Sequence, residues 1–261
     1  MKNFNNYKIL NNIENKWKWI GNSCWLDTLM INLLSNPNSY FIKKVLNFKD
    51  DDKIHYLILS FIITLYSDKY NIITFNQFTR EILKEQHVKF FNNETNIYDM
   101  ENNGSIGSIL DLIFRTYNIF FYYWDKSLNC NFLKVTSIPI PKFIDNKKIK
   151  IKKYINNYLN LYYNPKMIVF NVSSSYKKGS IPEYININDN EYKFQSATIF
   201  DSNHYTSIIY NDNYYYYIDI LTENSIYKIN TNNFKLINNL ELNQNHANLK
   251  NNSTFLFYYI I

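Results

Sequence analysis

The chain has 261 residues, of which 46% are hydrophobic and 18% aromatic, and its formal net charge is +6. This length and apolar content suit a folded domain with a sizeable core and exclude a disordered chain. Almost all of the positive charge is lysine, because Arg80 and Arg115 are the only arginines. We therefore expect no nucleic-acid partner.

Cysteine usage and hydropathy further narrow the class of protein and its cellular compartment. Two cysteines, Cys24 and Cys130, argue against a disulfide framework and favour a reducing compartment. Residues 1–19 are polar and lack the apolar segment of a signal peptide, and the longest apolar stretch, 56–66, is too short to span a bilayer. We expect no membrane partner, a cytoplasmic or nucleocytoplasmic location, and neither a metal nor another cofactor.

Helical periodicity dominates the first part of the chain, and a β pattern begins at Pro165. A helical half followed by an antiparallel β half predicts an α+β fold with a cleft where the halves meet. The predicted helices cover 24–34, 54–66, 74–84, 107–117 and 151–161, and the predicted strands cover 119–124, 132–138, 167–172, 192–200, 205–210, 214–220, 225–229 and 255–261.

Cys24 stands at the predicted start of the first helix, after the helix-capping residues Asn22 and Ser23. The N–H groups and dipole of a first turn stabilise a thiolate and can receive an oxyanion, so Cys24 is a candidate nucleophile. The alternative is a small buried hydrophobe, as most free cysteines are. Asp27 lies on the same helix face, and its charge disfavours a thiolate unless an imidazolium outweighs it.

His204 opens a predicted tyrosine-rich hairpin whose turn contains the residues 211–213. A four-residue loop places His204 directly across from Asp219, a two-residue loop places them diagonally on one face, and a three-residue loop separates them. In the first two cases Asp219 can accept from one ring nitrogen and leave the other for Cys24. The alternative is a structural histidine. The rival carboxylates are Asp201 and Asp212.

Several segments carry a resemblance to a known family, in that family's order. Residues 21–27 read Gly-Asn-Ser-Cys-Trp-Leu-Asp, and 203–205 read Asn-His-Tyr. The other segments that carry the resemblance are 164–170, 181–187, 192–200, 206–210, 217–219 and 253–258. Together they resemble the motifs of ubiquitin-specific proteases. The cysteine segment is most similar to that of the cylindromatosis-type and SUMO-directed branches.

The resemblance implies a papain-like cysteine protease with a helical thumb at about 20–116, reduced fingers at about 117–163 and an antiparallel β palm at about 164–261. It implies a monomer that cleaves after the C-terminal Gly-Gly of ubiquitin or a ubiquitin-like protein such as SUMO, without a cofactor. The implied catalytic residues are Cys24 as nucleophile, His204 as general base and acid, and Asp219 as orienting carboxylate. The implied oxyanion and substrate-positioning residues are Asn22, Ser23, Asn203 and Tyr205.

The chain also departs from the family pattern. Trp19 stands where many members have an oxyanion asparagine, Asn203 replaces a glycine, and the glutamine-rich box has no recognisable counterpart. Zinc-binding fingers are missing from the sequence pattern. The departure at Trp19 motivates one alternative, a catalytically silent module that binds ubiquitin-like proteins. The compact length and a composition typical of an AT-rich genome motivate another, a protease that processes Gly-Gly sites in a viral polyprotein inside the host cell.

Overall fold

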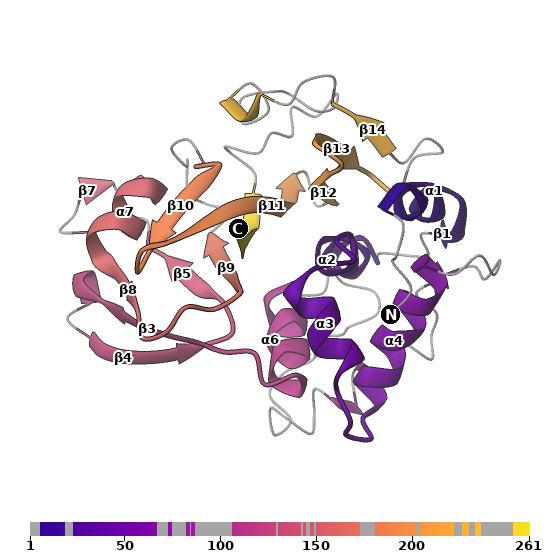
Figure 1. Cartoon of the computed structure of the whole chain (residues 1–261), viewed down its shortest axis with the longest axis horizontal. Helices are drawn as coiled ribbons and strands as arrows, with labels where there is room; N and C mark the ends of the chain where they lie inside the picture. Colours follow the sequence, from indigo (N-terminus) through magenta and orange to yellow (C-terminus); the bar gives the residue numbers. More distant parts are fainter. Residues whose placement is uncertain are drawn as a thin grey trace.

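The structure is a computed structural model of the whole chain, in which helices α1 to α6 gather on one side, whereas most strands and the helix α7 lie on the other (Figure 1). This arrangement confirms the predicted α+β fold class. The residues that the structure describes are 6–18, 23–66, 73–74, 82–83, 85–86, 106–128, 130–141, 143–144, 147–148, 150–172, 181–201, 204–221, 226–229, 233–235 and 253–261.

One helix, α2 (Cys24–Leu34), lies at the centre of the helical layer. All of its residues are buried, which fits a sequence that is almost continuously apolar. It packs between the large sheet and its neighbouring helices. The other helices of this layer are α1 (Asn6–Lys16), α3 (Tyr40–Leu46), α4 (Lys53–Tyr66) and α6 (Ile106–Thr116).

Local signals explain where these helices begin and end. Ser39 starts α3 by accepting a hydrogen bond from the Ile42 N–H at 3.2 Å. Asn118 follows α6 with a φ of 52°, and the Ile119 N–H closes the helix by donating to the Phe114 carbonyl at 2.7 Å. This is the left-handed end typical of helices, with asparagine in place of glycine.

Three predicted helices are confirmed and two need correction. The helices over 24–34, 54–66 and 107–117 are present within one residue at each end. The prediction over 74–84 is wrong at Thr74, which lies in β2 (Ile73–Thr74) beside β1 (Trp17–Lys18); 82–83 are helical, and 75–81 and 84 lie outside the described residues. The prediction over 151–161 is wrong beyond 158, because α7 (Ile151–Tyr158) is followed by the strand β8 (Leu159–Leu161).

A large sheet forms the second layer, with strand order β14-β13-β12-β11-β15-β9-β5 and with β10 also paired to β11. Its pairs are antiparallel except β5 with β9. The strands are β5 (Ile138–Ile140), β9 (Met167–Val172), β10 (Tyr184–Ile187), β11 (Asn190–Asp201), β12 (His204–Asn211), β13 (Tyr214–Ile218), β14 (Ile226–Lys228) and β15 (Ser253–Ile260).

A smaller sheet has the order β4-β3-β8, with β3 (Phe121–Asp125) between β4 (Cys130–Val135) and β8. The polar neighbours of Cys130 in the sequence predict a loop, but this residue begins β4. Short elements η1 (Lys126–Leu128), β6 (Phe143–Ile144) and β7 (Lys147–Lys148) complete this region.

The buried apolar side chains of both layers form one continuous cluster, so the helices and the large sheet share a core. Within the described part of the chain, no helix is long and apolar enough to cross a membrane.

Candidate active site

Cys24 is the first residue of α2, and only 5% of its surface is exposed. Ser23 precedes it at the N-cap position, and the Ser23 carbonyl accepts from the N–H groups of Leu26 and Asp27 at 2.9 and 3.0 Å. The positive end of the helix dipole therefore lies beside the sulfur.

The hairpin of β12 and β13 brings His204 and Asp219 together. Asn211 pairs with Tyr214 across a two-residue turn, in which Asp212 and Asn213 have φ values of 46° and 66°. This is the diagonal alternative of the sequence analysis, with both side chains on one face. The Nε2 atom of His204 lies 2.8 Å from Oδ1 of Asp219.

The carboxylate of Asp219 is fixed by more than the histidine. Its Oδ1 atom also accepts a hydrogen bond from the Leu221 N–H at 3.1 Å, just after β13 ends. The side chains of His204 and Asp219 are 21% and 13% exposed, so their ion pair is partly shielded from water. A shielded pair is screened less than one on the surface, and it orients the imidazole more firmly.

Cys24 is the second partner of the imidazole. Burial alone lowers the pKa of His204, but hydrogen bonds and charge interactions with Asp219 and Cys24 outweigh it and raise the pKa to about 9. Because Nε2 is bonded to Asp219, Nδ1 is the ring nitrogen left for the sulfur. The raised pKa favours the positively charged form of the ring at neutral pH.

This raised pKa predicts how stability depends on pH. The folded-state pKa of His204 lies above the ordinary 6.5, so its contribution to stability is fully present below pH 6.5 and is lost as the pH rises through about 9. The full shift corresponds to on the order of 3 kcal/mol. Urea unfolding of the wild type and of His204→Gln should show a difference in unfolding free energy that shrinks between pH 6.5 and 10. A difference that stays constant over this range would contradict the assigned interaction.

Tyr205 lies next to these residues. It pairs with Phe200 across β11 and β12, with ring centroids 4.6 Å apart. Burial raises its pKa, and so does the negative charge of Cys24, which indicates that the phenol is near the sulfur. The other positioning candidates, Asn22 and Asn203, lie outside the described residues, as does Trp19.

The sequence predicts Ser23 as a helix cap and Asp27 as a charge that disfavours a thiolate, but the structure shows other contacts for both. The Ser23 side chain does not cap α2. Its hydroxyl instead donates to Oδ2 of Asp27, and the indole N–H of Trp17 donates to Oδ1 at 2.7 Å. Asp27 is fully buried, so its carboxylate serves as a local acceptor and not only as a charge opposed to the thiolate.

A buried polar cluster that the sequence analysis missed joins the cysteine helix to the histidine strand. Asn32 of α2 donates to Ser207 Oγ of β12 at 3.1 Å and to the Thr28 carbonyl at 2.9 Å. Ser207 also donates to the Thr28 carbonyl, at 3.3 Å, and Ser196 of β11 donates to the Asn32 carbonyl, at 3.4 Å. In the sequence, the one signal for this polar cluster is Asn32, a polar residue within a largely apolar helix.

Removal of this cluster should be destabilising. We expect Asn32→Ala to lower the unfolding free energy by about 1–3 kcal/mol, because it leaves a buried hydroxyl with fewer partners. Asn47→Ala is the matched control, since Asn47 makes the same bond to the carbonyl four residues earlier but is exposed. The control should change stability by less than about 0.5 kcal/mol. If urea unfolding shows equal losses of unfolding free energy in the two variants, the cluster has no special role in stability.

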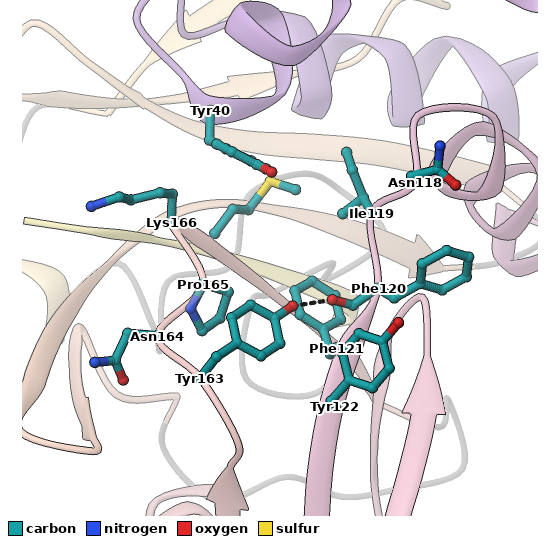
Figure 2. Close-up of a pocket in the computed structure, with 11 residues that line it drawn as sticks. Tyr40, Asn118, Ile119, Phe120, Phe121, Tyr122, Tyr163, Asn164, Pro165 and Lys166 are labelled. Carbon is teal, nitrogen blue, oxygen red and sulfur yellow. Dashed lines mark hydrogen bonds between the residues drawn. The ribbon is translucent and has the colours of Figure 1, made fainter.

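The structure also contains a pocket of about 260 Å³, whose lining includes none of these residues; Figure 2 shows the side chains that line it. Its walls come from α3, from 118–122 and from the chain that enters β9. Met167 of this pocket lies at the same level of the sheet as Lys193, whereas His204 pairs with Asp201 at the other end of β11. The intervening strand spans on the order of 25 Å, so the pocket does not belong to the candidate active site.

Metal-binding geometry is not found in the described residues, where no three His, Cys, Asp or Glu side chains form a group that could hold an ion. His55 is buried, with Nδ1 3.3 Å from the Tyr117 hydroxyl. The histidines at 87 and 246 lie outside the described residues.

In sequence, no protein-family model and no curated protein matches the chain. Solved structures do match. One is the Ubp8-Sgf11-Sgf73-Sus1 SAGA DUB module, with a TM-score of 0.54 and 13% identity over 97% of this chain and 69% of that one. An essential yeast splicing factor has a TM-score of 0.56 and 9% identity, covering 92% of this chain and 67% of that one.

A third is the Saccharomyces cerevisiae Pan2 pseudoubiquitin hydrolase–RNA exonuclease module, with a TM-score of 0.50 and 10% identity. The match covers 96% of this chain but only 52% of that one, so this chain spans about half of it. At these identities the likeness concerns the fold alone. The chain has the papain-like fold found in ubiquitin hydrolases, and a specific branch of ubiquitin-specific proteases remains a prediction.

Proposed function

We propose that the chain is a thiol isopeptidase that cleaves after the C-terminal Gly-Gly of ubiquitin or a ubiquitin-like protein. The observation that carries this proposal is the convergence of Cys24, His204 and Asp219, which lie far apart in the sequence. A cysteine at a helix start, an imidazole bonded to it and a carboxylate on the other ring nitrogen are the parts needed for acyl transfer.

The proposed reaction begins from the thiolate of Cys24 and the imidazolium of His204. The sulfur attacks the carbonyl carbon of the terminal glycine, and the electron pair of the C=O bond moves to the oxygen. The resulting oxyanion lies near the first turn of α2, whose N–H groups can stabilise it. When the C–N bond breaks, the leaving amine takes a proton from His204, and a thioester remains on Cys24.

Water completes the cycle. The now neutral His204 accepts a proton from the attacking water, and Asp219 stabilises the imidazolium that forms. The C–S bond breaks, the modifier leaves with a free carboxylate, and the thiolate–imidazolium pair is restored.

The proposal and the identity of the modifier are tested with a panel of substrates. Each substrate carries a fluorogenic amide on the C-terminal glycine of ubiquitin, SUMO or another ubiquitin-like protein. We expect saturable turnover of at least one modifier and little turnover of a peptide that carries only Gly-Gly, because a folded modifier adds binding energy. If the chain binds a modifier but turns over no substrate of the panel, it is instead the catalytically silent binding module. Cleavage of the short peptide alone would favour the polyprotein protease.

A further inference from the structure

Cys24 and His204 belong to different layers of the fold, so the distance between them depends on how α2 lies against β12. We propose that the buried hydrogen bond between Asn32 and Ser207 fixes this register and that both are positioning residues for acyl transfer. The inference rests on the proposed function and deepens it, because it adds two residues to those that bring the sulfur and the imidazole together.

Polar side chains link α2 to two strands of the large sheet. Asn32 Nδ2 donates to Ser207 Oγ at 3.1 Å, and Ser207 in turn donates to the Thr28 carbonyl at 3.3 Å. Ser196 of β11 adds a bond to the Asn32 carbonyl at 3.4 Å. All four residues are buried. The helix that begins at Cys24 is therefore bonded, inside the core, to the strand that begins at His204.

The bond lies at a similar depth along both elements. Asn32 follows Cys24 by eight residues, which is about 12 Å along a helix. Ser207 follows His204 by three residues, which is about 10 Å along a strand. Ser207 also reaches Thr28, one helical turn closer to the cysteine. Because helices and strands are stiff over such lengths, a bond at this depth constrains the pair at the start of each element.

Hydrogen bonds specify this register in a way that apolar packing does not. Burial of apolar surface is non-directional, so an apolar helix can slide on a sheet with a small change in buried area. A hydrogen bond weakens steeply outside a narrow range of distance and angle. A slide of about 1 Å would break the contacts of Asn32 and Ser207 and leave buried polar atoms unpaired.

Stability alone does not account for an asparagine at this position. Within the described residues, Asn32 Oδ1 has no hydrogen-bond partner, and a buried polar atom of this kind is unfavourable. Leucine has the same branched shape without polar atoms. Replacement of both partners of a buried polar pair by apolar groups of similar shape is often neutral or stabilising. What the asparagine adds over leucine is direction.

The register matters because acyl transfer depends strongly on distance. Proton transfer between Cys24 and His204 needs the two groups within about 2.6–3.2 Å or one water molecule. A misplacement of about 1 Å can lower the rate by about a hundredfold. A change in register at Asn32 should therefore lower kcat and leave KM nearly unchanged, since the contacts that bind the modifier are untouched.

The test is a double variant, Asn32→Leu with Ser207→Ala, which removes the bond and leaves neither partner unpaired. Its unfolding free energy in urea should stay close to that of the wild type. Its kcat on the substrate identified in the panel should fall by about ten- to a hundredfold, with KM within about twofold. A stable double variant with the kcat of the wild type would overturn the proposal.

The imidazole of His204 gives a second readout that needs no substrate. The titratable groups around it are Asp219, Cys24, Tyr205 next in β12 and Asp201 paired with it on β11. The interaction with Cys24 raises the pKa of the ring to about 9 together with that of Asp219. A looser contact should lower the NMR titration midpoint by about 0.5–1 pH unit, a three- to tenfold change in the protonation equilibrium. An unchanged midpoint in the double variant would contradict the positioning role.

Matched variants give this readout a scale. Cys24→Ala should lower the His204 midpoint at least as far as the double variant, because it removes the sulfur itself. Tyr154→Phe is the control, since it removes a buried hydrogen bond of 2.7 Å between α7 and Asp125 of β3, which carry none of the candidate catalytic residues. It should lower stability and leave the midpoint at the wild-type value.

The two readouts separate this inference from the proposed function. If no modifier is turned over but the midpoint falls in the double variant, the positioning role stands and the proposed reaction does not. If turnover is found and neither kcat nor the midpoint changes, the reverse holds. Should the double variant fail to fold, Ser207→Ala alone replaces it, because that change deletes one buried oxygen and adds no volume.

Discussion

A Cys24→Ala variant is expected to lose modifier cleavage by a factor on the order of 10⁴ or more while it keeps its fold. The reason is that the proposed reaction forms its covalent bond at this sulfur. Because Cys24 is a small buried residue, alanine should fill its site with little loss of stability. Hydrolysis of the fluorogenic modifier amide, together with thermal unfolding, measures both effects.

Cys130→Ala is the matched control, since it removes the only other cysteine of the chain. It should retain turnover within about twofold of the wild type. Comparable turnover in the Cys24 variant would mean that another nucleophile carries the reaction, and the proposed mechanism would then be wrong.

An Asp219→Asn variant is expected to lower kcat by about 10²–10⁴, because the amide can present its N–H₂ group to Nε2 and disturb the ring's tautomer and orientation. It should also change the pH profile. Asp219 contributes to the raised pKa of His204, so its loss brings that pKa down from about 9. The leaving amine needs the protonated ring, so the alkaline decline of kcat/KM should move to lower pH.

The measurement is kcat/KM from pH 5 to 10 for the wild type and the variant. Asp212→Asn serves as the control, because Asp212 lies in the turn at the far end of the hairpin and asparagine also tolerates its positive φ of 46°. Its profile should overlay that of the wild type. An alkaline limb that does not move in the Asp219 variant would show that this carboxylate does not act through His204.

The hairpin illustrates what the sequence could and could not predict. The alternation of residues and the carboxylate in the second strand were enough to place His204 and Asp219 on one face in two of three registers. The choice between registers was open because 211–213 are all good turn residues. The structure selects the two-residue turn, with both central residues at positive φ, which matches the twist of the strands.

Other differences arise from contacts that a local pattern does not contain. Helical periodicity continues past Tyr158 into Leu159 and Leu161, but these residues form β8 because they pair with β3. Propensity is a weak guide where tertiary pairing is available. The spacing of Ile9, Ile13 and other apolar residues was a signal for α1, hidden by the many asparagines around it.

At the site itself, the sequence identified which side chains to examine but not how the polar ones would be used. Ser23 has the residue type and position of a cap, yet its hydroxyl bonds to Asp27, whose orientation depends on Trp17. Asn32 looked like one polar residue among many apolar ones, and its partner lies 175 positions away on β12. Long-range hydrogen bonds of this kind require the fold before they can be recognised.

Covalent labelling tests the central claim most directly. A panel of ubiquitin and ubiquitin-like proteins with a C-terminal electrophile is incubated with the wild type, and the modified peptide is located by mass spectrometry. We predict one adduct per chain, on Cys24, that forms with at least one modifier and is lost in Cys24→Ala and strongly slowed in His204→Ala. An adduct on another residue, or equal labelling of Cys24→Ala, would contradict the account.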